Sequence, residues 1–361
     1  GHGRKAYEWA PPFHTLTVDM ESLNYWIRPQ RLGAPLVALG ATGDNPPGAL
    51  GQPGTVGVIQ GDDLSAGRIS GGRFRVRKRD GLDTTTGTEV SGFLTEEKSR
   101  RFTFGSNAAG VPTLAFPVIR AELGREGAFL ISDAPRGLTG SVSVEAASRL
   151  WGATALRYAT VIDKPDFSLE MLAGYRYLTL EERLQVQGRL FSLNLNLTDN
   201  FNDRFETDNE FHGGVIGCRA RKTFGRWEVS VRTTIAAGNM HQVVNASGNN
   251  TLTAGGVTAI FNSGLFVLPS NRGSDTTDRF AILPEVQAKV SYAVTPFMRL
   301  IGGYDALYLS SAARAAEQVD RSINRTQRQG GVLVGPARPG LSVSASNFWL
   351  HGFNMGLEWL Y

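Results

Sequence analysis

The chain ends in Phe353-Asn-Met-Gly-Leu-Glu-Trp-Leu-Tyr361, and this stretch decides the fold class. An apolar or aromatic residue stands at every second position from 353 to 361, with Asn354, Gly356 and Glu358 between them. A period of two predicts a β-strand with one apolar face. Soluble domains usually end in a frayed polar segment, whereas an outer-membrane barrel closes its sheet with its last strand and places an aromatic residue at the interface. The stretch therefore predicts an all-β fold, a transmembrane antiparallel β-barrel of a bacterial outer membrane.

The composition of the chain agrees with a barrel. Of its 361 residues 41% are hydrophobic, and no run reaches the roughly 18 to 20 apolar residues that a transmembrane helix needs. A barrel needs no such run because polar lumen-facing residues alternate with apolar lipid-facing ones. Cys218 is the only cysteine, which excludes an internal disulfide, so closed strand pairing is the expected source of stability.

Runs with a period of two predict about ten strands in one domain that spans residues 1–361. The runs cover 15–27, 71–79, 88–98, 141–162, 166–189, 208–224, 226–243, 278–294, 296–310 and 347–361. Short turns between them alternate with long connections at 28–70, 99–140, 190–207, 244–277 and 311–346. Outer-membrane barrels have short periplasmic turns and long external loops, and an even strand count leaves both termini in the periplasm. We therefore expect an up-and-down barrel with long structured external loops and a periplasmic N-terminal segment at 1–14. Twelve strands are the alternative, if residues 56–60 or 114–119 join the sheet.

Apolar and polar residues take opposite faces of the predicted strands. Val229 and Val231 alternate with Ser230 and Arg232, and residues 166–178, 285–292 and 298–308 show the same pattern. A soluble β-sandwich also alternates, with its charged residues facing water. Strands of about ten residues or more, and aromatic residues at strand ends such as Trp227, favour the membrane barrel.

With the apolar face toward lipid, the charged residues of the strands point into the lumen. The predicted lumen-lining residues are Asp19, Glu21, Arg73, Arg75, Arg77, Glu145, Arg149, Arg157, Glu170, Arg176, Arg219, Arg221, Glu228, Arg232, Glu285, Lys289, Arg299, Asp305 and Glu358. Cations outnumber acids in this set. Eight-stranded barrels are filled by side chains and those of about 16 to 18 strands hold an aqueous channel, so ten strands predict a narrow lumen.

Two functions agree with such a lumen. One is a porin that lets ions or small solutes diffuse passively through a narrow, arginine-rich and anion-preferring lumen. The alternative is a barrel plugged by salt bridges, because an unpaired charge in a partly desolvated interior is costly. A plugged barrel would have a structural, surface-exposed or oligomer-forming role. Proline-containing turns at 46–48, 268–271 and 335–339 predict ordered loops that fold over the mouth or pack against other envelope proteins.

The sequence offers little for catalysis. His212, His241 and His351 fall near the external strand ends, with Asp203, Asp208 and Asp278 nearby, but the alternation places these histidines on the lipid-facing side. The chain contains no Walker loop, no dinucleotide fingerprint and no Cys/His metal spacing. We therefore expect no enzyme activity, no metal and no cofactor. The densest basic run, in the second predicted strand, is too unspecific to predict binding of nucleic acid.

Several stretches carry a resemblance to a known family. They are Gly48-Ala-Leu-Gly-Gln-Pro-Gly-Thr55, Ser148-Arg-Leu-Trp-Gly-Ala153, Leu172-Ala-Gly-Tyr-Arg-Tyr-Leu178, Gly238-Asn-Met-His-Gln-Val-Val244, Leu268-Pro-Ser-Asn271, Asp278-Arg-Phe-Ala281 with Pro284-Glu-Val286, and Val334-Gly-Pro-Ala-Arg-Pro339. In these stretches, which run in order along nearly the whole chain, the sequence resembles the putative beta-barrel porin-7 family of bacterial outer-membrane proteins. The resemblance implies a single outer-membrane barrel with a porin role, and it brings no catalytic residues.

The C-terminal residues also resemble a sorting signal. Gly356, Trp359 and Tyr361 match the signal that the outer-membrane insertion machinery reads, although Met355 stands where a polar residue is usual. The expected partners are therefore outer-membrane lipid and this machinery. Copies of the same chain or other envelope proteins are expected to contact the external loops.

Overall fold

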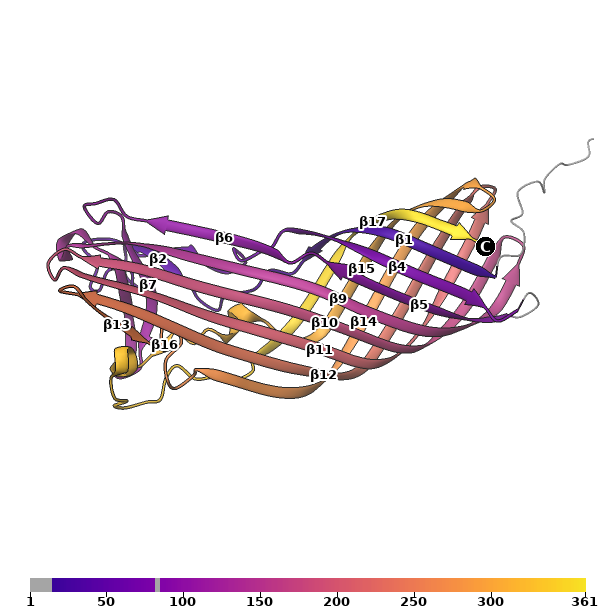
Figure 1. The fold of residues 1–361 in the computed structure, drawn as a ribbon. Coiled ribbons are helices and arrows are strands. Elements are labelled where there is room, and N and C mark those ends of the chain that lie inside the picture. The colour runs from indigo at the N-terminus through magenta and orange to yellow at the C-terminus, as the bar shows by residue number, and fades with distance from the viewer. Residues whose placement is uncertain (1–14, 82–84) are drawn as a thin grey trace, which may run out of the picture.

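The computed structural model describes residues 15–81 and 85–361, and the described chain is mostly β-sheet (Figure 1). Its helical segments are three short 3-10 helices, η1 (Ala134–Arg136), η2 (Ala315–Gln318) and η3 (Arg325–Gly330). Ten strands form a closed antiparallel ring. They are β1 (Leu16–Ile27), β4 (Arg68–Arg79), β5 (Thr86–Thr95), β9 (Leu138–Lys164), β10 (Phe167–Ser192), β11 (Leu197–Phe224), β12 (Trp227–Ala254), β14 (Gly273–Thr295), β15 (Met298–Ala313) and β17 (Ala345–Leu360). Among the described residues, no helix is long and apolar enough to cross a membrane.

The ring closes where the sequence predicted it to close. The last strand, β17, pairs with β1 on one side and with β15 on the other, so that Leu357 lies opposite Met20 and Leu300. Pairing of β9 with both β5 and β10 completes the circle. The prediction of a ten-stranded antiparallel barrel is confirmed. The predicted segment at 1–14 lies outside the described residues.

The two ends of the molecule differ in their connections. The first described residue, Thr15, and the last, Tyr361, lie at one end with the turns after β9, β11 and β14, and we call this the terminal end. There the backbone oxygen of Tyr361 accepts hydrogen bonds from the N–H groups of Thr15 and Leu16. The long connections lie at the opposite end, the loop end, at the left of Figure 1. Strands β9 to β12 have 26 to 28 residues and extend far toward the loop end, whereas β1 and β4 have 12. The ring therefore opens into a curved sheet beyond the shorter strands.

Two short strands extend this curved sheet at its edges. On one side β6 (Lys98–Gly105) pairs with β9 beyond the point where β5 ends. On the other side β13 (Val257–Phe261) pairs with the last residues of β12.

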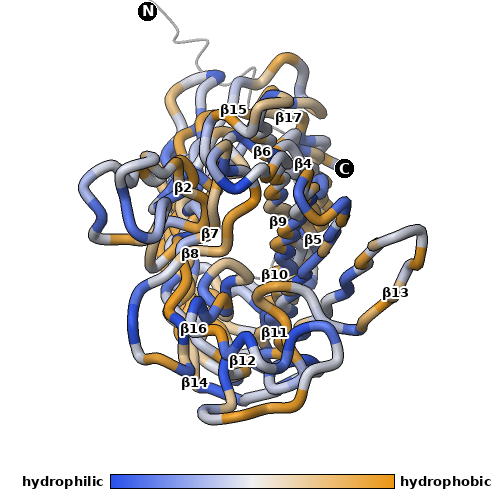
Figure 2. Tube along the Cα trace, turned by 90° about the vertical axis from the view of Figure 1, so that its left-hand side faces the viewer, coloured by the Kyte–Doolittle hydropathy of each residue, from blue (hydrophilic) through white to orange (hydrophobic). Residues whose placement is uncertain are grey.

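The long connections build a second sheet against the inner face of the first. Its order is β16-β7-β2-β3, with β8 paired to β7. These strands are β2 (Val37–Gly40), β3 (Val56–Ile59), β7 (Thr113–Arg120), β8 (Arg125–Ser132) and β16 (Ser322–Ile323). Figure 2, which views the molecule from the loop end, shows β2, β7 and β8 facing β9 and β10, and the β12–β13 hairpin projecting to one side. The segments considered as an eleventh and twelfth barrel strand, 56–60 and 114–119, belong to this second sheet.

The predicted loop boundaries are wrong at the loop end. Most of residues 190–207 and 244–277 continue β10, β11 and β12 or form β13, and residues 28–70, 99–140 and 311–346 contain strands of the second sheet. The physical reason is that these strand extensions leave the lipid. Their outer face meets water, so the pattern of apolar residues toward lipid ends while the strand pairing continues.

An apolar core joins the two sheets into a sandwich. Val142, Val144, Val186, Phe201 and Phe205 on the inner face of the curved sheet pack with residues of the second sheet, at most 3% exposed. The second sheet contributes Val37, Ile59, Leu114, Phe116 and Val118, and the connection after β13 contributes Leu265, Phe266, Val267 and Leu268. We call this unit the loop-end sandwich.

A buried ion pair holds the loop-end sandwich to the barrel. Both guanidinium contacts of Arg314 to the Glu182 carboxylate measure 2.7 Å, and the two side chains are fully buried. Arg314 Nη2 also donates to the backbone oxygen of Arg28 at 3.0 Å, and Ser148 Oγ donates to Glu182 Oε1 at 3.1 Å. These bonds fix the connections after β1 and β15 to the inner face of β10.

Aromatic side chains mark the limits of an apolar band on the outer face. Near the terminal end Trp227 packs against Tyr292, with 4.8 Å between ring centroids. Toward the loop end Trp151 packs against Tyr177 at 5.1 Å. Phe167 and Tyr177 on β10 lie at these two limits, and the strand rises about 33 Å between them. At the usual strand tilt of about 35–45°, this gives a height of about 25 Å along the barrel axis. This height matches the apolar band of a transmembrane barrel.

Candidate functional site

The inner face of the barrel near the terminal end carries a dense network of ion pairs. Nine cations and eight acids take part, and we call them the lumen network: Arg73, Arg75, Arg77, Arg176, Arg219, Arg221, Arg232, Lys289 and Arg299 with Asp19, Glu21, Glu89, Glu170, Glu228, Glu285, Asp305 and Glu358. The alternation of each strand turns these side chains inward, while their neighbours in sequence face outward.

Glu89 is the centre of this network. Its carboxylate contacts Arg232 Nη1 at 2.7 Å and Arg75 Nε at 3.4 Å, and it also pairs with Arg219. These three arginines come from β4, β11 and β12, so one carboxylate joins β5 to its neighbour β4 and to the adjacent strands β11 and β12, which do not pair with β5. Glu89 is only 1% exposed, and such a carboxylate is stable in its charged form only because cations surround it.

A second cluster crosses the lumen between β1, β4 and β15. Arg73 contacts Glu21 Oε2 at 3.0 Å and Asp305 Oδ2 at 2.9 Å. The Tyr25 hydroxyl donates to Asp305 Oδ2 at 2.6 Å and accepts from Arg73 Nη2 at 2.7 Å. Lys289 on β14 also pairs with Glu21. The cluster therefore joins strands from β14 to β4, which β15, β17 and β1 separate in the ring.

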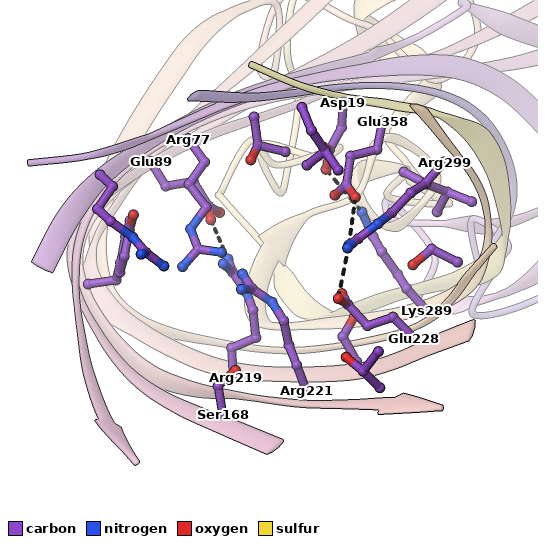
Figure 3. A pocket seen from close by; sticks show the side chains of 18 of the residues that line it. Asp19, Arg77, Glu89, Ser168, Arg219, Arg221, Glu228, Lys289, Arg299 and Glu358 are labelled. Carbon is purple, nitrogen blue, oxygen red and sulfur yellow. Dashed lines mark hydrogen bonds and ion pairs between the residues drawn. The ribbon is translucent and has the colours of Figure 1, made fainter. Parts of the chain in front are cut away.

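The network is looser where it approaches the terminal end. Arg299 contacts Glu228 Oε2 at 2.9 Å and Glu358 Oε1 at 3.2 Å, as Figure 3 shows. Arg221 is also partly exposed, and its Nη1 contacts the buried carboxylate of Glu170 at 3.2 Å. The side chains of Arg299, Glu228 and Glu358 are 16–17% exposed, compared with 0–2% for Glu89 and Glu170.

An open vestibule adjoins this looser part. It is a cavity of about 640 Å³ between the lumen network and the turns of the terminal end, and Arg77, Arg219, Arg221, Lys289 and Arg299 are among the side chains that line it. The guanidinium of Arg77 lies over the ring of Tyr158, 4.1 Å from its centroid. The vestibule can hold water, ions or a small anion at this end of the barrel.

An apolar layer fills the lumen on the other side of the network. Its side chains point inward and are at most 4% exposed: Leu23, Leu150, Leu172, Leu178, Leu180, Phe211, Met240, Leu283, Leu307 and Phe348. Between this layer and the vestibule, a cavity of about 10 Å³ lies beside Arg73, Arg176, Arg232, Glu285 and Gln287, about enough for one water molecule. The described lumen is therefore closed by paired charges and then by hydrocarbon.

The prediction that the side chain points into the lumen is wrong for three residues on β9. Arg149 and Arg157 are exposed on the outer face, and Glu145 lies on the same face, paired with Arg101. Arg157 pairs instead with Asp80 at the terminal rim. The physical reason is position along the strand. Arg157 and Arg149 lie at the two limits of the apolar band, where an outward charge reaches water or headgroups.

All the other residues predicted to line the lumen belong to the lumen network. The prediction missed its central acid, Glu89, although the residue lies in a predicted strand. Glu89 shares its face with Phe93, and that aromatic residue hid the polar character of the face. The fully buried phenol of Tyr25 was hidden in the same way, since an aromatic residue at the end of a strand is typical of the interface.

The predicted sorting signal lies in β17 and just beyond it. Trp359 is half-buried opposite Val18, Gly356 is opposite Glu21, and Tyr361 is exposed. Their role in insertion stays a prediction.

The three histidines of the described strands, His212, His241 and His351, lie on the outer face, as the alternation predicted. The Nδ1 atoms of His212 and His351 lie 2.6 Å from the hydroxyls of Tyr175 and Tyr304, respectively. His241 Nδ1 lies 3.0 Å from Asp278 Oδ1, and both side chains are largely exposed. Within 15–81 and 85–361, no three His, Cys, Asp or Glu side chains converge to hold a metal.

Comparison with solved structures finds other β-barrels at low similarity. The outer membrane protease OmpT from Escherichia coli matches with a TM-score of 0.42 and 8% identity over 99% of this chain and 100% of that one. A deletion mutant of the TodX monoaromatic hydrocarbon channel gives 0.27 and 8% identity over 99% and 92%. A Pseudomonas aeruginosa FadL homologue gives 0.22 and 9% identity over 96% and 90%. Likenesses this low assign no function.

The family is shown by the sequence itself. No curated protein matches the chain. The family model described as "Putative beta barrel porin-7" matches residues 18–361, which is nearly the whole chain and includes every strand of the ring except the first two residues of β1. The chain therefore belongs to the putative beta barrel porin-7 family of bacterial outer-membrane proteins.

Proposed function

We propose that this protein is a closed outer-membrane barrel whose role is structural, holding the loop-end sandwich outside the cell. The observation that carries the proposal is the filled lumen, in which the lumen network is followed by the apolar layer. Breaking one buried ion pair by removing a partner costs about 3–5 kcal/mol, and a passage wide enough for a solute would have to separate several such pairs. Thermal fluctuation alone would rarely open it.

The orientation is part of the proposal. The short turns and both chain ends face the periplasm, and the loop-end sandwich faces outward, as in barrels with short periplasmic turns and long external connections. The outer-membrane insertion machinery would recognise Gly356, Trp359 and Tyr361, and lipid would contact the apolar band. Copies of this chain or other envelope proteins would contact the loop-end sandwich.

A binding or structural role fits the outer face better than catalysis. His212 and His351 each lie beside a tyrosine hydroxyl and pack against further aromatic rings, and His241 pairs with the exposed Asp278. A nucleophile or general base usually needs a second, orienting group and an enclosed site, and these histidines lack the enclosure. We assign no cofactor and no nucleic-acid partner.

Passive diffusion of small ions is the second candidate function, and the vestibule favours it. Its cavity of about 640 Å³ brings Arg77, Arg219 and Arg221 close to the terminal opening, which would attract anions. Passage would require rearrangement of the lumen network and of the apolar layer above it. A narrow, anion-preferring conductance would be the signature of such an open state.

Single-channel recording in a planar bilayer with a salt gradient tests the proposal. Folding and insertion of the purified protein are checked first, by heat-modifiable migration in electrophoresis and by protease protection of the barrel. The proposal predicts no discrete conductance steps from inserted protein. Regular steps with an anion-shifted reversal potential, reduced by Arg219→Gln with Arg221→Gln, would contradict it and establish the second candidate.

A further inference from the structure

We propose that the outer face of the loop-end sandwich binds a neutral, hydroxyl-rich saccharide. The site is a groove of about 300 Å³ that crosses β9, β10, β11 and β12. The side chains that line it are mostly neutral hydroxyls and amides: Ser143, Gln187, Asn200, Asn202, Asn249 and Thr251. An amide offers both a donor and an acceptor, and a hydroxyl can act as either, which is the pairing that the adjacent hydroxyls of a sugar require.

These polar groups are largely free to bind a ligand. Gln185 Nε2 donates to Asn202 Oδ1 at 2.7 Å, which fixes the Asn202 amide and leaves its NH₂ group available. Ser143, Gln187 and Asn249 form no side-chain hydrogen bond with any residue that the structure describes. Gln187 and Asn249 are also exposed. The groove therefore presents donors and acceptors that the fold itself does not use.

The charge distribution of this face separates the groove from its surroundings. Neighbouring charged side chains are paired with each other, as in Arg101 with Glu145 and Arg183 with Glu97. The groove itself contains one charged residue, Arg189. A phosphorylated or strongly acidic ligand would call for several converging cations, so the groove suits a ligand that is neutral overall.

The groove has a rigid floor. All of its side chains stand on four adjacent, fully paired strands, and the opposite face of the same strands carries the buried core residues Val142, Val186 and Phe201. Polar groups that stand on strands hold their spacing better than groups on loops. A saccharide would thus meet a pre-formed row of partners.

The position of the groove agrees with a saccharide ligand. Ser141 borders it, and from Trp151 to Ser141 the strand β9 rises about 33 Å. The groove thus lies well beyond the apolar band. This step rests on the orientation given under Proposed function, in which the loop end faces away from the cell. In that orientation the groove lies at the height of the polysaccharide that covers an outer membrane. The chemistry of the groove itself does not depend on the orientation.

Saturation-transfer NMR on the purified, folded protein tests the inference with two probes. One is a lipid-free polysaccharide with an uncharged repeating unit, released by mild acid from the lipopolysaccharide of an outer membrane and freed of its core phosphates, and the other is maltoheptaose, a free neutral glucan. Binding of the first alone would identify membrane polysaccharide as the source, and binding of the second would identify free oligosaccharide. Since the test needs no membrane, its failure is distinct from a failure of the closed-barrel proposal.

Matched variants connect the signal to the groove. Asn249→Ala removes an amide inside the groove, and Asn245→Ala removes one from the same face of the same strand outside it. We expect Asn249→Ala and Gln187→Ala each to weaken binding about threefold to tenfold, the loss of one or two hydrogen bonds, while Asn245→Ala binds as the wild type does. Lack of binding by both probes, or equal effects of Asn249→Ala and Asn245→Ala, would overturn the inference.

Discussion

The barrel and the loop-end sandwich use the same four strands in opposite ways. On β11 within the barrel, Arg219 points inward and Ile216 points outward, toward lipid. Farther along the same strand, Phe205 and Phe201 point inward and Asn202 points outward. The side-chain direction keeps its period of two throughout, and only the chemistry of each face changes.

The difference shows that the medium beside each face sets its composition. In the barrel the outer face meets hydrocarbon, so polar groups gather inside, where only mutual pairing stabilises them. In the loop-end sandwich the outer face meets water, so the inner face can be apolar and pack against a second sheet. The apolar layer of the lumen lies at the boundary between the lipid-embedded barrel and the loop-end sandwich.

The largest expected effect is the loss of the central acid of the barrel. Glu89→Gln would leave Arg75, Arg219 and Arg232 without their shared carboxylate, and removing one partner from a buried charge pair costs about 3–5 kcal/mol. Urea unfolding in detergent measures the change in the free energy of unfolding. Glu228→Gln, at the more exposed end of the network, is the control and should cost clearly less. Equal losses would mean that burial does not set the strength of these pairs.

An effect of similar or slightly smaller size is expected in the core of the loop-end sandwich. Phe205→Ala removes a fully buried ring, a change that usually costs about 3–5 kcal/mol. We expect faster protease cleavage of the second sheet while the barrel keeps its heat-modifiable migration. Phe280→Ala, which removes a ring that is 73% exposed on the outer face, should leave cleavage unchanged. Simultaneous loss of both regions would show that they do not behave as separate units.

The outer face of the barrel gives the next largest effect. Val231 is 44% exposed within the apolar band, and Val231→Arg should reduce the free energy of insertion by about 2–4 kcal/mol. Ser230→Arg, one position away, places its charge in the vestibule and should be tolerated. The fraction of each variant that folds into lipid vesicles measures these two effects. Similar yields from the two variants would refute the assignment of faces.

The smallest effect belongs to the charged outer face of the loop-end sandwich. The side chains of Arg183 and Glu97 are 29% and 49% exposed, and such a pair usually contributes less than about 1 kcal/mol. Arg183→Gln should therefore leave the unfolding midpoint of the protein nearly unchanged. A large loss would mean that this face is covered in the assembled protein.

Sequence predicted the fold of the barrel well because lipid imposes a strict pattern on every strand that crosses it. It could not predict how far β10, β11 and β12 extend, since outside the lipid the apolar face moves inward and its partner comes from distant segments. Val37 and Phe116, for example, pack against this face from separate connections. Such packing leaves no local signal in the sequence.

The sequence predicted most of the charged residues that line the lumen, but it did not predict the apolar layer that closes it. The alternation of apolar and polar residues predicted most of the lumen network. It was wrong at Arg149 and Arg157, because a charged side chain at the limit of the apolar band can face outward. Leu172, Leu178 and Leu180 share the inner face with Arg176, yet an apolar residue in a barrel strand suggests a lipid-facing position. The layer that closes the lumen was therefore not visible in the alternation.

Accessibility of inward-facing cysteines tests the closed lumen most directly. In a Cys218→Ser background, Ser230→Cys would place a thiol in the vestibule, and Leu178→Cys would place one in the apolar layer. With the folded protein in lipid vesicles, a small charged thiol reagent should modify Ser230→Cys rapidly and leave Leu178→Cys protected until the protein is unfolded. Rapid modification at both positions would contradict the closed barrel and show that water and ions pass through the layer.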